Sequence, residues 1–257
     1  RPAEAEGVAS PTRLTRWKGR WLLFAVVAAV VLGAAAAAYS VLLRGETSPA
    51  VVDLVWSRVP LDEAVFGGPG WMTGVAAGGP GLVAVGYAGE SAEAGQVVAA
   101  VWTSSDGIAW SRVPHNEAVF AGAGWPRVVG MYGAAAGGPG LVAVGSDAGA
   151  GDQGAAAAWA STDGITWSRV PHDEAVFGGA DHQEMSGVAA GGPGLVAVGL
   201  DLEAGDGGAA AVWTSPDGLT WSRAVHDEAV FGGAVFQAMA SVAAAGPGLV
   251  AVGLDAG

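Results

Sequence analysis

The stretch Gly-Leu-Val-Ala-Val-Gly at Gly194–Gly199 occurs four times in this chain without a substitution. The other copies begin at Gly81, Gly140 and Gly248, and a Trp-Ser-Arg segment recurs with them about every 54 residues. A fixed period of this size indicates a repeat protein in which each repeat is one supersecondary unit. The repeat therefore decides the fold class before any single residue is considered.

Each repeat contains four short apolar segments separated by turn signals. In the third repeat these segments cover residues 185–191, 195–200, 209–214 and 219–225. Turns about every 8–12 residues exclude a helical solenoid, and four strands in about 50 residues are typical of a β-propeller blade. We therefore predict an all-β fold, namely an incomplete β-propeller with about 3.5 four-stranded blades, preceded by one transmembrane helix.

The spacing of the repeats sets the predicted domain boundaries. Residues 51–257 form the propeller repeats. The complete blades and one partial blade have the approximate bounds 71–114, 126–171, 183–225 and 238–257. Residues 51–59 align with the fourth strand of a blade, and we expect this outer strand to close the ring with strands of the last blade.

The turn between the third and fourth strands carries the most specific motif of the repeat. Its pattern is Ser-x-Asp-Gly-x-x-Trp in three copies. Asp and Ser side chains accept hydrogen bonds from backbone N–H groups a few residues on, Gly supplies a positive φ, and Trp covers the turn. We predict a structural role in this turn for Ser104, Asp106, Gly107, Trp110, Ser161, Asp163, Gly164, Trp167, Ser215, Asp217, Gly218 and Trp221.

This motif resembles the Asp-box, also called the bacterial neuraminidase repeat, of sialidase-like β-propellers. The family pattern is Ser-x-Asp-x-Gly-x-x-Trp, so the box of this chain is a variant that lacks one residue between Asp and Gly. The resemblance covers roughly residues 51–257. It implies a propeller whose boxes lie on the hairpin between the third and fourth strands of a blade, away from the active centre.

The resemblance also implies what a working sialidase requires. Three arginines grip the substrate carboxylate, a Tyr–Glu pair supplies the nucleophile, and an Asp is the acid/base. Beyond residue 50, every arginine except Arg127 belongs to the repeated Trp-Ser-Arg segment on the outer strand, and neither Tyr87 nor Tyr132 forms a recognisable pair with Glu. We therefore predict no catalytic residue and no cofactor. A sialidase-like glycoside hydrolase, with catalytic groups partly in sequence beyond this chain, stays the alternative.

Residues that break the repeat are better candidates for a binding site. They precede or begin the first strand of a blade, which lines the channel of a propeller. Variable aromatic and polar residues on a constant scaffold are where binding usually resides, although such residues also serve as loop filler. We predict that an unknown glycan, peptide or protein ligand is bound by Trp71, Trp125, Arg127, Tyr132, His182, Glu184 and Gln237.

Two other polar patterns are assigned to the scaffold. A His or Leu followed by two polar residues precedes each Ala-Val-Phe, as in His172–Glu174, and recurs with the repeat, whereas a metal or acid–base site is usually unique. Acidic turns at residues 90–93, 147–152 and 201–206 lack the spacing of an EF-hand. We therefore predict no metal site.

Residues 21–43 form an uncharged apolar run that is long enough to cross a bilayer as a helix. The basic tail at residues 1–20 precedes it, and the positive-inside rule keeps that tail in the cytoplasm. We predict a single-pass anchor, a linker at residues 44–50, and repeats outside the cytoplasm. The alternative is a signal peptide that is cleaved in the Ala-rich half, which leaves a secreted protein.

Charge and composition exclude several kinds of site and partner. The net charge is -13 and there is no cysteine, which excludes disulfides and thiolate metal sites. A chain this acidic repels phosphate backbones, so nucleic acid is not an expected partner. The high Ala, Gly and Val content suggests a bacterial source. Because the chain starts at Arg1 and stops within a repeat, we expect a fragment.

Together these patterns predict a membrane-anchored, extracytoplasmic binding or interaction module rather than an enzyme. An envelope assembly or scaffold factor is a further alternative.

Overall fold

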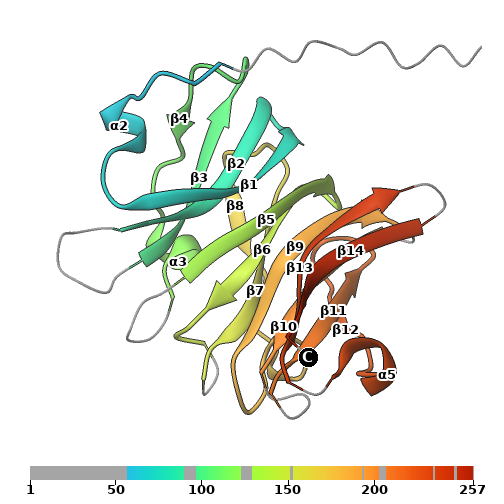
Figure 1. Ribbon diagram of the computed structural model, residues 1–257. Coiled ribbons are helices and arrows are strands. Elements are labelled where there is room, and N and C mark those ends of the chain that lie inside the picture. Colours follow the sequence, from blue (N-terminus) through green and yellow to red (C-terminus); the bar gives the residue numbers. More distant parts are fainter. Residues whose placement is uncertain are drawn as a thin grey trace, which may run out of the picture. The chain divides into compact units, whose positions relative to one another are not determined.

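The computed structural model describes residues 57–89, 97–122, 129–150, 153–192, 194–202, 207–233, 235–245 and 248–256 (Figure 1). All of these except Ser57 belong to one compact unit, Arg58–Gly257. The predicted basic tail, membrane segment and linker lie outside the described residues. Within the described ranges, no helix is long and apolar enough to cross a membrane.

The prediction of an all-β fold is confirmed, because the described chain forms antiparallel sheets in chain order. The first sheet contains β1 (Gly70–Gly78), β2 (Gly81–Gly89), β3 (Val97–Ser104) and β4 (Ser111–Arg112). The second contains β5 (Val129–Gly137), β6 (Gly140–Asp147), β7 (Ala155–Ser161) and β8 (Trp167–Arg169). The third contains β9 (Gln183–Gly191), β10 (Gly194–Asp201), β11 (Ala209–Ser215) and β12 (Ser222–Arg223). The fourth contains β13 (Gln237–Ala245) and β14 (Gly248–Asp255).

The first strand of each sheet contacts the first strand of the next, in the order β1, β5, β9, β13 (Figure 1). Glycines make this approach possible. A Cβ atom on Gly74 would lie 3.2 Å from the Cα atom of Gly133, and one on Gly133 would lie 3.0 Å from the Cα atom of Gly187. Because these backbones touch, successive sheets fan out from a shared inner edge, which is a propeller-like arrangement.

The core lies between successive sheets and repeats with them. Val83 and Val85 of the first sheet pack with Met131, Leu141 and Trp159 of the second, and all five are almost fully buried. Val142 and Val144 of the second sheet pack in the same way with Met185, Leu195 and Trp213 of the third. Apolar burial of this kind is the main stabilising term, so each sheet depends on its neighbour.

The Glu-Ala-Val-Phe stretches form single-turn helices, which the sequence analysis did not predict: α2 (Glu63–Phe66), α3 (Glu117–Phe120), α4 (Glu174–Phe177) and α5 (Glu228–Phe231). The preceding Asp or Asn caps each one, as where Asp173 Oδ1 accepts from Ala175 N at 3.0 Å. Phe177 is buried in the core, and the carbonyl of Val176 accepts from the Trp213 indole at 2.7 Å. Equivalent bonds tie α2 and α3 to the third strand of the sheet that follows each of them.

The predicted outer strand at residues 51–59 lies mostly outside the described residues. Ser57, Arg58 and Val59 are described and belong to no strand. Pairing of residues 51–56 with a distant blade stays a prediction.

Candidate ligand-binding site

The repeats resemble one another in sequence at one end of each sheet and differ at the other end. In the first sheet β2 pairs antiparallel with both β1 and β3, so β1 and β3 run in the same direction. The Asp-box turn follows β3 and therefore lies at the end where β1 finishes. We call this the box end, and we call the opposite end, where the first strand of each sheet starts, the site end. The three repeats that contain the box motif agree closely at the box end, whereas their first strands begin with different residues at the site end.

At the box end the side chains bind their own turn. Ser161 Oγ accepts from Gly164 N at 2.8 Å, and Asp163 Oδ1 accepts from the N–H groups of Ile165 and Thr166 at 2.8 and 2.6 Å. The Trp167 indole donates to the carbonyl of Gly164 at 3.0 Å. The same bonds recur in the first and third sheets. The φ of the box glycine is +76° in all three turns, which favours Gly there.

The box carboxylates are held in their charged form. Backbone hydrogen bonds from Thr166 and Ile165 lower the pKa of Asp163 to about 2, and the pKa values of Asp106 and Asp217 are lowered by the equivalent bonds. The turn also packs on the preceding sheet, since a Cβ atom on Gly79 would lie 2.5 Å from the carbonyl oxygen of Asp163. These contacts describe a structural turn.

At the site end a repeated methionine separates the residues that differ. Met72, Met131, Met185 and Met239 occupy equivalent positions, each opposite the last glycine of the Gly-Leu-Val-Ala-Val-Gly stretch. Met131 and Met185 are fully buried. The residue after each methionine is unpaired in a β-bulge, and bulges re-aim side chains at strand ends. In the second and third sheets the constant methionine therefore belongs to the core, and the residues on either side of it differ between repeats.

An aromatic row crosses from the first sheet to the second at this end. The rings of Trp71 on β1 and Tyr87 on β2 have centroids 5.2 Å apart, and Tyr87 meets Tyr132 on β5 edge-on at 6.3 Å. Trp71 is 59% exposed, while both tyrosines are half-buried. These three residues form a partly solvated aromatic surface, which we call the aromatic row.

Tyr132 takes its position because Gly130 has no side chain. A Cβ atom on Gly130 would lie 2.7 Å from the Tyr132 ring. The ring therefore lies over Gly130, and its hydroxyl reaches Ser146 Oγ on β6 at 3.1 Å. Ser146 is buried, so its hydroxyl anchors the far end of the ring.

Acidic and polar groups of the third sheet continue the row. Glu184 on β9 accepts from Ser186 Oγ at 3.0 Å and lies 3.8 Å from His182 Nε2. Burial raises the pKa of the Tyr132 phenol, and the negative charge of Glu184 adds to this rise. The phenol therefore stays neutral and can donate a hydrogen bond. We call Trp71, Tyr87, Tyr132, His182 and Glu184 together the inner-strand site.

The remaining candidates from the sequence do not join this site. Trp125 and Arg127 lie outside the described residues. Gln237 is buried, and its Nε2 donates to Asp255 Oδ1 at 3.0 Å, as Gln183 donates to Asp201 at 2.9 Å in the third sheet. A buried contact that repeats between sheets explains Gln237 as part of the scaffold. Within the described ranges, no group of three or more His, Cys, Asp or Glu residues is placed to hold a metal ion.

Sequence reasoning missed Tyr87 and Ser146 as members of this surface. A signal for both was present, because the residue directly after each Gly-Leu-Val-Ala-Val-Gly stretch varies, and these two residues occupy that position. Their pairing opposite Trp71 and Gly130 follows only from the register of the sheets.

Comparison with known proteins gave no match: no protein-family model, no curated protein and no solved structure resembles the chain significantly. The inner-strand site is therefore interpreted from its own chemistry.

Proposed function

We propose that this chain is a binding module and that its inner-strand site holds a carbohydrate. The observation that carries the proposal is the aromatic row beside a carboxylate, built from residues that differ between otherwise equal repeats. Sites for small ligands combine aromatic surface with a few placed polar groups. A sugar ring presents an apolar C–H face and a rim of hydroxyls, which match the Trp71 ring and the oxygens of Tyr132 and Glu184.

In this proposal the sheets are blades of an incomplete β-propeller that is related to the Asp-box family. The box turns support the relation, since Ser, Asp, Gly and Trp act together in three turns. Residues 21–43 anchor the module in the membrane, and the repeats lie outside the cytoplasm, where glycans are accessible.

A sialidase-like hydrolase is the second candidate and has weaker support. A phenol that acts as nucleophile needs a lowered pKa, whereas the pKa of Tyr132 is raised. Within the described ranges, Arg112, Arg169 and Arg223 lie on the fourth strands and not at the inner-strand site. A glycan or peptide that is bound without being cleaved fits these groups better.

Tryptophan fluorescence of the full chain in detergent tests the proposal. We expect at least one of cellohexaose, chitohexaose and laminarihexaose to change the emission of the exposed Trp71. Trp71→Ala should weaken that binding tenfold or more, while Trp110→Phe, which alters a tryptophan at the box end, should leave it unchanged. Absence of binding by all three sugars, or equal binding by Trp71→Ala, would contradict the proposal. Binding of a random-peptide pool that depends on Trp71 would replace the glycan by a peptide.

A further inference from the structure

In the second and third sheets, an arginine on the fourth strand reaches back to an aspartate on the second strand. Arg169 contacts Asp147 at 2.6 Å, and Arg223 pairs with Asp201. Each guanidinium crosses the third strand over a tryptophan ring, at 5.6 Å from Trp159 in the second sheet and at 5.7 Å from the equivalent ring in the third. Both aspartates are nearly fully buried, so each pair is a repeated part of the scaffold.

The first sheet has the arginine without the aspartate. Arg112 lies over the Trp102 ring at 5.9 Å, as its counterparts do. The position of the aspartate is taken by Ala88, which pairs with Gly70 on β1. Among the described residues, Arg112 has no carboxylate partner, and its side chain is exposed where those of Arg169 and Arg223 are half-buried. Its guanidinium keeps its hydrogen-bond donors available.

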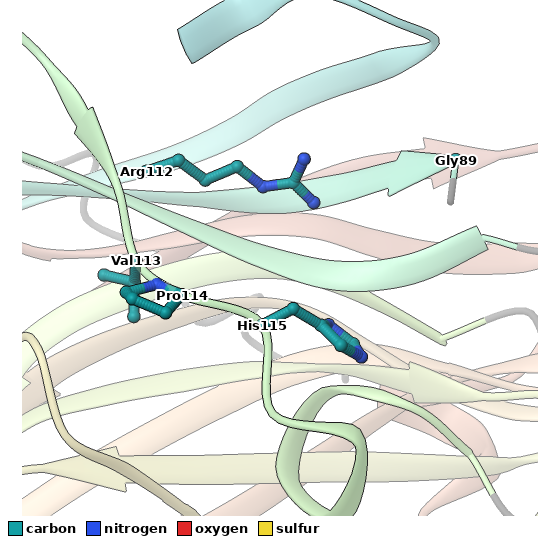
Figure 2. Close-up of a pocket in the computed structure, with 5 residues that line it drawn as sticks. All are labelled: Gly89, Arg112, Val113, Pro114 and His115. Atoms are coloured by element: carbon teal, nitrogen blue, oxygen red, sulfur yellow. The ribbon is translucent and has the colours of Figure 1, made fainter. Parts of the chain in front are cut away.

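In the first sheet, the space that an aspartate side chain would fill is open. A cavity of about 60 Å³ is lined by Gly70, Trp71, Ala88, Trp102 and Arg112 together with the segment from Val65 to Pro69. On its other side Arg112 borders a wider groove of about 450 Å³ with Gly89, Val113, Pro114 and His115. Figure 2 shows Arg112 and His115 extending in the same direction along this groove. The guanidinium therefore faces accessible space on the side where the other two sheets supply an aspartate.

We propose that Arg112 and the space beside Ala88 bind an oxyanion of an external ligand, either a carboxylate or a phosphate group. A guanidinium binds both through paired N–H donors, and the two buried Arg–Asp pairs show that this scaffold holds a carboxylate at the equivalent place. His115 adds a ring nitrogen at the groove, although Glu117 lies 3.2 Å from it. The site borders the inner-strand site, since Trp71 lines its cavity, but it goes beyond the carbohydrate proposal because its ligand group is bound by Arg112 and needs neither tyrosine.

The comparison between the sheets suggests the variant that tests the proposal most directly. Ala88→Asp restores the aspartate of the other sheets, and Gly70 leaves more room for it than Gln183 leaves for Asp201. We expect this internal carboxylate to pair with Arg112, to raise the melting temperature, and to exclude external anions. Arg112→Gln should also abolish anion binding, and it keeps the test informative if Ala88→Asp folds poorly.

Ligand-observed NMR on the full chain in detergent measures binding directly. Acetate is followed by saturation transfer to its methyl group and inorganic phosphate by its 31P linewidth, at equal ionic strength in chloride. We expect a dissociation constant on the order of 1 mM for the better anion, and at least tenfold weaker binding in Ala88→Asp and Arg112→Gln. A preference for acetate identifies a carboxylate group as the ligand, and a preference for phosphate identifies a phosphate group.

Three outcomes would overturn the proposal. The first is no binding of either anion by the wild-type chain. The second is an equal loss of binding in Arg58→Gln, which removes the exposed arginine of another Trp-Ser-Arg segment and so reports a general charge effect. The third is binding that emerges only in a Glu90→Gln/Glu93→Gln variant, because a carboxylate of the chain itself would then occupy the site.

Discussion

The box end and the site end belong to the same strands but use side chains in opposite ways. At the box end, Ser161 and Asp163 bind backbone within five residues, and the first and third sheets repeat the bonds to backbone N–H groups. At the site end, the charge of Glu184 on the third sheet acts on Tyr132 of the second, and the residues on either side of the constant methionine differ between repeats. The difference teaches that the scaffold is specified by local contacts that can be copied, which leaves the other end free to acquire a binding surface.

The largest expected effect separates core tryptophans from the exposed one. Trp159 is fully buried and its indole donates to the carbonyl of Val119 at 2.8 Å, so Trp159→Ala should destabilise the fold by about 3–5 kcal/mol. Trp71→Ala removes an exposed ring and should cost less than about 1 kcal/mol. Denaturant unfolding measures both. Similar losses for the two variants would show that the site end is also core.

Serine side chains at the two ends should contribute differently to the free energy of unfolding. Ser161 Oγ accepts from Gly164 N and donates to the carbonyl of Thr166 at 2.7 Å, so Ser161→Ala leaves buried backbone groups unpaired and should cost about 1–2 kcal/mol. At the site end the one bond of Ser146 Oγ is to the hydroxyl of the half-buried Tyr132 and leaves no backbone group unpaired, so Ser146→Ala should cost less than about 1 kcal/mol. The midpoints of urea unfolding, at an unchanged slope, compare the stability of the two variants. A larger loss in Ser146→Ala would show that the serine at the site end contributes more to stability than the serine of the box.

Acid should weaken the box end. The folded pKa of Asp163 is about 2, below the ordinary value of 3.8, so its contribution to stability is present above pH 3.8 and is lost as pH falls toward 2. Asp106 and Asp217 act in the same direction. We expect the melting temperature to fall between pH 4 and pH 2, and Asp163→Asn to make that fall shallower. A slope that Asp163→Asn leaves unchanged would assign the acid sensitivity to other groups.

The smallest expected effect is a titration shift at the site end. The charge of Glu184 helps to raise the pKa of Tyr132, so Glu184→Gln should move that pKa back toward 10.0 without a measurable loss of stability. Ultraviolet absorbance of the phenolate measures the change, and Tyr132→Phe identifies which transition belongs to Tyr132. If Glu184→Gln leaves the transition in place, the two side chains do not interact and the inner-strand site is not continuous.

The sequence predicted the parts of the fold that depend on local pattern. Apolar segments of strand length between Gly-Pro-Gly and Asp-Gly turns predict antiparallel strands, because each turn imposes its own backbone geometry. The single-turn helices escaped prediction, because four residues such as Glu174–Phe177 are too few to establish a helical period. The candidate site was predicted in part: Trp71, Tyr132, His182 and Glu184 were named, whereas Gln237 proved to be a buried scaffold residue.

The sequence by itself therefore determined the repeat, the strand order and the self-bonded turns, since each depends on contacts between residues close in the chain. Only the tertiary structure decided which differing residues meet. Tyr87 joins Trp71 through strand register, and Tyr132 reaches the charge of Glu184 because the inner strands pack glycine against glycine. Likewise, the alanine at position 88 is a minor difference between repeats in the sequence, and its importance follows only from the cavity that it shares with Arg112. Contacts between sheets depend on register and close approach, and no local pattern encodes either.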